Sequence, residues 1–204
     1  MNPLKRRILE ISYKYRLSHL GSCLSAVDII DKIYTHKKAE EKFVLSSGHA
    51  GLALYTVLER HLALNAENIW LHHGVHPDRC ENCHLDCSSG SLGNGLPIAV
   101  GMALADRTKN VYCLISDGEC TEGSIWEALR IAEDQDLDNL KVFVNLNGVT
   151  AYSEIDTYWL SQRLQMFGVP KENIIHTTVD QLPFLEGIDA HYHIMTDEEY
   201  NSIP

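Results

Sequence analysis

Residues 110–148 read NVYCLISDGECTEGSIWEALRIAEDQDLDNLKVFVNLNG, and this stretch decides the fold. It begins with a nearly all-apolar run over 110–118 and ends with a second one over 140–148, which is typical of buried strands in a parallel sheet. Between them, residues 121–135 carry apolar side chains at helical spacing. Strand, helix and strand in this order predict a right-handed βαβ unit, whose ligands bind outside the carboxyl ends of the strands.

The remaining segments add helices and a further strand. Periodic apolar residues predict helices over 3–17, over 25–34, from near Ala50 onward and within 92–110. A short buried strand is expected at Phe43–Leu45. No repeat or linker divides the chain, so we expect one α/β domain over residues 1–204, with a parallel sheet flanked by helices.

Composition limits the classes of function. Apolar residues make up 45% of the 204 residues, without a run long enough to span a membrane. The formal net charge of -11 would repel a phosphate backbone, so nucleic acid is not an expected partner. The basic start is not followed by the apolar segment of a signal peptide, and we therefore expect a cytoplasmic protein that binds no membrane.

Polar residues end both strands of the βαβ unit. Asp117 follows the first strand and Asn147 the second, so their side chains are expected to meet at one edge of the sheet. Carboxylate, amide and carbonyl oxygens suit Mg²⁺, Ca²⁺ or Mn²⁺ and leave coordination positions for diphosphate oxygens. Gly118 would let the backbone approach these phosphates closely. Taken alone, Asp-Gly and Asn-Gly pairs are also ordinary turn formers.

Three of the six cysteines lie close together in RCENCHLDC, as Cys80, Cys83 and Cys87. With His76 and His84 nearby, this spacing can supply three or four zinc ligands. A loop with unpaired thiols is the alternative, because the second, distant ligand pair of a typical zinc module is missing.

The segment SDGECTEG, followed by NLN ending at Asn147, resembles the thiamine diphosphate signature of the transketolase family. The resemblance includes SHLGSCLSAVDII, KFVLSSGHAGLALY, GVHP and GSLGNGLPIAVGMALA, in the family's order, and continues to about residue 152. It implies an α/β thiamine-diphosphate-binding fold of the diphosphate-binding (PP) type. The tail over 153–204 matches only weakly.

The resemblance also implies site residues. Asp117, Asn147 and the carbonyl of Val149 would hold the metal. The cofactor itself would lie against two loops and the end of the second strand, at Gly90, Ser91, Leu92, Gly118, Glu119 and Asn147. Ser116, where the family usually has Gly, places a small side chain near the diphosphate and removes no ligand.

Three histidines, His19, His49 and His76, fall in matching blocks. In the family they surround the thiazolium ring and the sugar, where imidazoles donate to substrate oxygens and move protons. Glu122 and Glu127 match acidic positions that couple paired active sites across the dimer interface. Helix capping and a solvated surface are the alternatives for these two residues.

The cofactor-activating glutamate of this family lies on a pyrimidine-binding domain that these residues do not contain. We therefore expect a separate pyrimidine-domain subunit and a dimer of heterodimers, with each cofactor between domains of different protomers. Leu20, Leu24, Ile125 and Trp126 are expected to form an exposed apolar patch in the lone chain.

The activity implied is transfer of a two-carbon ketol unit from a ketose, expected to be phosphorylated, to an aldose acceptor. In the tail, His191 is a candidate substrate contact, and a surface pair with His193 is the alternative. Two other functions stay open. One is a different thiamine diphosphate enzyme, such as the α chain of a 2-oxo acid dehydrogenase or a deoxyxylulose phosphate synthase; the other is a non-catalytic, zinc-stabilised interaction subunit.

Overall fold

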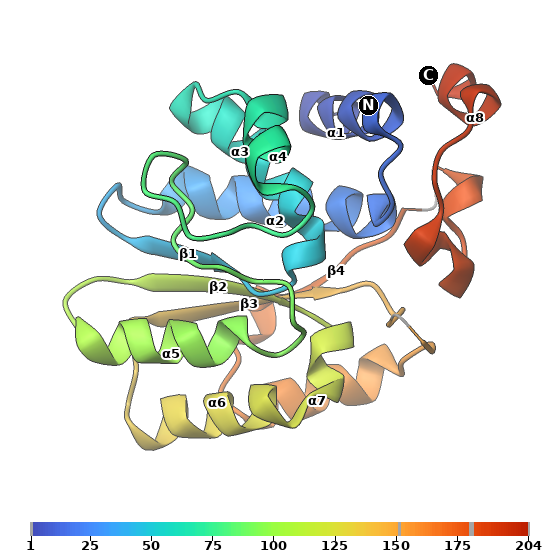
Figure 1. Ribbon diagram of the computed structural model, residues 1–204. Coiled ribbons are helices and arrows are strands. Elements are labelled where there is room, and N and C mark those ends of the chain that lie inside the picture. The colour runs from blue at the N-terminus through green and yellow to red at the C-terminus, as the bar shows by residue number, and fades with distance from the viewer. Residues whose placement is uncertain (1, 151, 180–181, 204) are drawn as a thin grey trace.

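A parallel sheet forms the centre of the protein. The computed structural model describes residues 2–150, 152–179 and 182–203. Within them, four parallel strands are arranged in chain order: β1 (Lys42–Leu45), β2 (Val111–Ser116), β3 (Leu140–Leu146) and β4 (Ile174–His176) (Figure 1). Since all four run in the same direction, their carboxyl ends lie at one edge of the sheet, as the sequence predicts.

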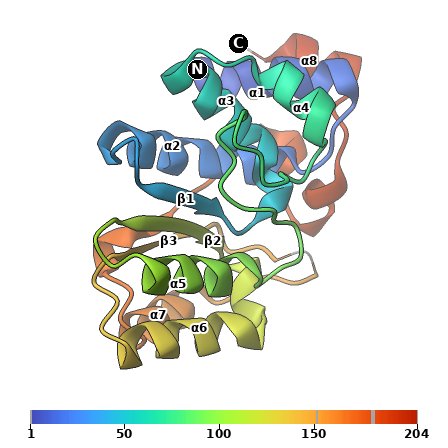
Figure 2. The ribbon, with the colours of Figure 1, turned by 60° about the vertical axis from the view of Figure 1, so that its left-hand side comes forward.

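Helices cover both faces of this sheet. One face is covered by the first four helices of the chain: α1 (Pro3–Tyr15), α2 (Leu20–His36), α3 (Gly51–Leu62) and α4 (Ala66–His73) (Figures 1 and 2). The other face is covered by α5 (Gly95–Ala105), α6 (Gly123–Asp134) and α7 (Thr157–Met166). Crossovers of one hand place α5, α6 and α7, which are the last α-helices before β2, β3 and β4, on the same face. The predicted parallel sheet flanked by helices is confirmed.

The strand residues alternate between two hydrophobic cores. Leu114 packs with α1–α4, whereas Cys113 and Ile115 pack with α5–α7. Because successive strand side chains point to opposite faces, a strand that is covered on both sides must be apolar throughout. This explains the nearly all-apolar run within 110–118.

The predicted apolar patch is wrong. Leu20, Leu24 and Ile125 are buried in these two cores, at 0%, 4% and 0% exposure. Trp126 is half-buried, and its indole N–H donates to the carbonyl oxygen of Cys120 over 2.9 Å. The helix expected over 25–34 begins at Leu20, which adds a turn whose apolar side chains face inward.

The tail returns to the start of the chain. Helix α8 (Asp197–Ser202) lies beside α1, and the rings of Tyr200 and Tyr13 stack with their centroids 4.0 Å apart (Figure 1). Arg16 adds an ion pair to Asp197 over 2.7 Å. Within the described ranges, none of the helices combines the length and apolarity needed to cross a bilayer.

Candidate active site

A pocket of about 250 Å³ lies where β1, β2 and β3 end and α2 begins. Most of the residues predicted for the site line it: His19, His49, His76, Gly90, Leu92, Asp117, Gly118, Asn147 and Val149. These residues come from five separate parts of the chain. The carboxyl edge of a parallel sheet brings them together because each strand ends there in a polar loop.

Asp117 connects the ends of β2 and β3. Its Oδ2 accepts hydrogen bonds from the backbone N–H groups of Asn147 at 2.8 Å and Gly148 at 2.6 Å, and its Oδ1 accepts from Gly118 at 3.0 Å. The side chain is only 1% exposed, and burial raises the pKa of this carboxyl, although the backbone N–H groups act in the opposite direction. Gly148 has a φ of +88°, which glycine adopts without strain.

The donors around Asp117 fit a divalent cation. The amide oxygen of Asn147 accepts from the backbone N–H of Val149 over 2.9 Å, which fixes the loop that follows β3. All three residues line the pocket. A buried carboxylate beside an amide oxygen and backbone carbonyls is the donor set that hard cations prefer, and an opposite charge would offset the cost of burying this carboxylate.

Three imidazoles gather on the opposite wall. The ring centroids of His19 and His49 are 5.5 Å apart, and that of His191 lies 4.5 Å from His19 and 5.5 Å from His49. Burial first, and then the neighbouring histidines, lower the pKa of His19 to about 4 and that of His49 to about 3; burial also lowers the pKa of His191. All three rings are therefore neutral at pH 7, and each carries one N–H donor and one acceptor nitrogen.

The histidine cluster includes a nitrogen that the protein leaves unpaired. His19 Nδ1 is buried and has no hydrogen-bond partner among the described residues. His19 adopts a left-handed conformation, with φ +61°, at the start of α2. A strained backbone and an unpaired polar atom at a pocket wall are typical of a ligand-binding position.

His76 reaches the pocket from the loop between α4 and α5. Its ring lies against Gly90, where a Cβ atom would come within 3.0 Å of the imidazole. Gly48 is similarly close to this loop, since a Cβ there would be 2.6 Å from the backbone nitrogen of Gly90. Glycine at both positions therefore allows the loop to pack directly against the turn that carries His49.

Glu119 is not on the pocket wall, although the sequence predicts it as a cofactor contact. It is fully buried; its Oε1 accepts from Ser46 Oγ at 2.5 Å and from Gly93 N at 3.0 Å, and its Oε2 accepts from Ser116 N at 3.1 Å. Both oxygens are thus used by the protein. The geometry makes Glu119 a brace between the ends of β1 and β2 and the glycine-rich loop.

Three other predicted residues also lie outside the pocket lining. Ser91 is exposed, between Gly90 and Leu92, which do line it. Glu122 is exposed at the start of α6, where its side chain packs against Gly93, and Glu127 is exposed on the same helix. These positions are open to a partner chain and do not contact the pocket.

The structure adds pocket residues that the sequence did not single out: Ser22, Ser47, Ala50, Asn145, Thr150, Tyr152 and Tyr192. Several sit in the quoted motifs, next to predicted residues, and that adjacency was the available signal. The hydroxyl of Ser116 lies beside the turn that follows β2, where its Oγ accepts a hydrogen bond from Glu119 N over 3.4 Å. In the tail, His191 lies in the pocket, while His193 bonds Glu199 over 2.9 Å.

The structure groups the expected zinc ligands differently. Cys80 and Cys83 lie together, but their third neighbour is His73, at the end of α4. Cys87 is buried elsewhere, and its thiol donates to the carbonyl oxygen of Ser88. Cys87 is therefore removed from the set, because the hairpin that follows Cys83 directs it into the opposite core.

The fold and site define an α/β protein with a polar ligand pocket at the carboxyl edge of a parallel sheet. Residues 9–182 match the family model for transketolase, thiamine diphosphate binding domain. The chain belongs to the transketolase family.

Relatives include both single-chain enzymes and subunits. Human transketolase is 35% identical over 150 residues, which are 63% of this chain and 24% of that protein. The 6-deoxy-6-sulfo-D-fructose transketolase subunit SqwG of a Clostridium species is 34% identical over 179 residues, covering 77% of this chain and 63% of the subunit. An apulose-4-phosphate transketolase subunit of Phocaeicola vulgatus is 31% identical over 163 residues, covering 70% of this chain and 58% of that subunit.

A solved structure supports the fold. Transketolase from Campylobacter jejuni superposes with a TM-score of 0.75 at 21% identity, over 96% of this chain and 40% of that one. The chain thus spans about a quarter of the length of human transketolase, about two fifths of the Campylobacter protein and about three fifths of the two subunits.

Proposed function

We propose that this chain is the diphosphate- and metal-binding subunit of a two-subunit transketolase, which transfers a two-carbon ketol unit from a phosphorylated ketose to an aldose acceptor. The observation that carries the proposal is the meeting of Asp117 and Asn147 with three neutral histidines in one pocket. Family membership supports the same chemistry.

In this proposal the strand ends hold the metal and the diphosphate. Asp117, the amide oxygen of Asn147 and the carbonyl of Val149 would bind Mg²⁺, whose remaining positions would take diphosphate oxygens. Gly118 leaves room for close approach, since the nearest atom to a Cβ there is 3.6 Å away. When bound, thiamine diphosphate supplies the nucleophilic carbon and the electron sink that carbon–carbon cleavage in a ketose requires.

The histidines would bind the sugar substrate and transfer its protons. A neutral imidazole can donate a hydrogen bond to a carbonyl or hydroxyl oxygen and accept a proton at its other nitrogen. In this proposal His49 and His19 would bind these oxygens and take up the hydroxyl proton released as the bond breaks. Their burial keeps water away and makes each hydrogen bond stronger than it would be in solvent.

A second chain would complete the site. The pocket, at about 250 Å³, is smaller than the roughly 300–1,000 Å³ typical of ligand sites, which fits one wall of a shared site. Two relatives are themselves named as transketolase subunits. On the α5–α7 face, Ile98 and Leu104 of α5 are each 40% exposed and offer apolar surface to a partner. We propose a dimer of heterodimers.

The test combines this chain with a pyrimidine-binding transketolase subunit from the same genome, with thiamine diphosphate and Mg²⁺. Light scattering measures the mass, and an aldehyde-release assay measures ketol transfer from phosphorylated ketoses. We expect two copies of each chain and activity only in the mixture. Full activity of this chain alone would contradict the two-subunit arrangement. Decarboxylation of pyruvate without cleavage of any ketose would contradict the transketolase reaction.

A further inference from the structure

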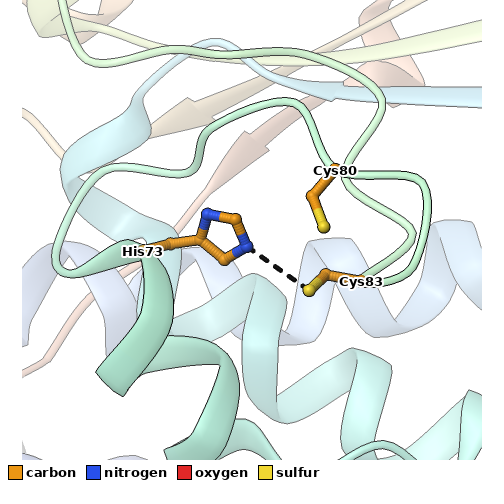
Figure 3. Close-up of side chains that lie close together, drawn as sticks. All are labelled: His73, Cys80 and Cys83. Carbon is orange, nitrogen blue, oxygen red and sulfur yellow. Dashed lines mark hydrogen bonds between the residues drawn. The ribbon is translucent and has the colours of Figure 1, made fainter.

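A second cluster of metal-ligating side chains lies outside the pocket. His73 ends α4, and Cys80 and Cys83 lie in the loop that follows. Their ligand atoms all lie within 4.8 Å of one another, and His73 Nε2 is 3.3 Å from Cys83 Sγ. Figure 3 shows the imidazole and both thiols pointing toward one shared space. Each of the three residues is partly accessible.

The backbone holds the two thiols in place without help from the cluster. Cys80 and Leu85 form an antiparallel bridge with two hydrogen bonds of 2.9 Å each, and His84 N donates to the carbonyl oxygen of Glu81 over 3.1 Å. His84 has a φ of +53°, so the chain reverses sharply after Cys83. The tight hairpin places both sulfur atoms of the Cys-x-x-Cys pair on the side that faces α4.

We propose that His73, Cys80 and Cys83 bind a zinc ion, with a water molecule as the fourth ligand. Two thiolates and one imidazole are soft and borderline donors, which select zinc over the oxygen-preferring cations expected at Asp117. The partial exposure of the cluster leaves one tetrahedral position open to solvent. Binding releases the two thiol protons to solvent, so the ion is held by two thiolates and a neutral histidine.

The ion would fasten the loop that carries part of the pocket. Between the cluster and the pocket, Ser89 N donates to the carbonyl oxygen of Pro77 over 3.0 Å, and Arg79 N donates to Ser88 Oγ over 2.8 Å. These bonds join the two arms of one loop, which carries His76 and Gly90 at its pocket end. A metal bridge from this loop to α4 would therefore fix the position of His76. This role rests on the proposed function, whereas the metal site itself does not.

Elemental analysis of the purified full chain tests the site directly. We expect one zinc ion per chain in the natural sequence, and at least a tenfold lower content in His73→Asn and Cys83→Ser. Two matched controls, His72→Asn on the same helix and Cys87→Ser in the same loop, should keep the zinc, because neither residue belongs to the cluster. Circular dichroism checks that every variant is folded.

Cobalt replacement supplies a readout that does not depend on the variants. Co²⁺ bound by this ligand set should show tetrahedral visible bands and thiolate-to-cobalt charge-transfer absorption, both lost on adding excess zinc. The proposed site would be overturned if the natural chain bound neither metal, or if the Cys83→Ser variant kept its full zinc content. Zinc removal that leaves ketol transfer by the assembled enzyme unchanged would overturn only the role assigned to His76.

Discussion

The backbone N–H of His19 donates to the carbonyl oxygen of His191 over 3.1 Å, and their imidazole rings meet edge to face with centroids 4.5 Å apart. This contact joins the start of α2 to a short 3-10 helix of the tail, Ile188–Tyr192. The tail therefore closes one side of the pocket. His191 lies beyond residue 182, where the family match ends, so the tail supplies the pocket with a histidine from outside the matched range.

Replacing His49 with Gln should lower turnover of the assembled enzyme roughly a hundredfold or more, the usual cost of losing a proton-transfer group. The measurement is kcat for ketol transfer at saturating cofactor. His193→Gln is the matched control, because that histidine lies outside the pocket lining and bonds Glu199. Equal turnover in both variants would remove His49 from the proposed chemistry.

Acid should destabilise the protein through the buried histidines. The folded-state pKa values of His49 and His19, about 3 and about 4, lie below the ordinary value of 6.5. Below pH 6.5 the unfolded chain therefore binds more protons than the folded chain does. The free energy of unfolding falls with pH until the pH reaches the folded-state pKa values.

For His49 alone, the loss between pH 7 and pH 5 is about 2 kcal/mol. His19, which is more open to solvent, adds less. Urea unfolding at the two pH values measures the total. A His19→Asn/His49→Asn double variant should show a smaller loss, and an identical pH dependence in both proteins would exclude these two rings as the cause.

Removing the carboxylate in Asp117→Ala should abolish Mg²⁺-dependent binding of thiamine diphosphate to the assembled enzyme, because the diphosphate charge would lose its bridging cation. Calorimetry measures the affinity. Asp156→Ala provides the control, since Asp156 also accepts a backbone N–H, at the exposed start of α7. Affinity in Asp117→Ala that equals the control would refute the metal assignment.

The change Glu119→Gln should lower the free energy of unfolding by roughly 1–3 kcal/mol. Whichever way the amide is oriented, its NH₂ group faces a buried backbone N–H, either that of Gly93 or that of Ser116. Urea unfolding tests this. Glu127→Gln, at an exposed position of α6, should stay within about 0.5 kcal/mol of the natural protein. A loss no larger than the control's would show that Glu119 does not brace these loops.

Apolar pattern alone predicted three of the four described strands and several of the helices around them, but not β4, α4 or α8. The mainly apolar runs within 110–118 and 140–148 required cover on both faces, and this placed Asp117 and Asn147 at one edge. The motifs around these two residues indicated the family. These features depend on residues near one another in the chain, and so the sequence could reveal them.

The sequence by itself determined the parallel α/β fold, the family and most of the pocket residues. Only the tertiary structure decided which side chains meet: His191 joins His19, His73 replaces Cys87 beside the other thiols, and Glu119 is turned inward. The physical reason is that burial and distance depend on how separate elements pack. Local sequence periodicity and motif spacing do not predict where a helix end, a hairpin or a tail lies relative to a strand that is distant in the chain.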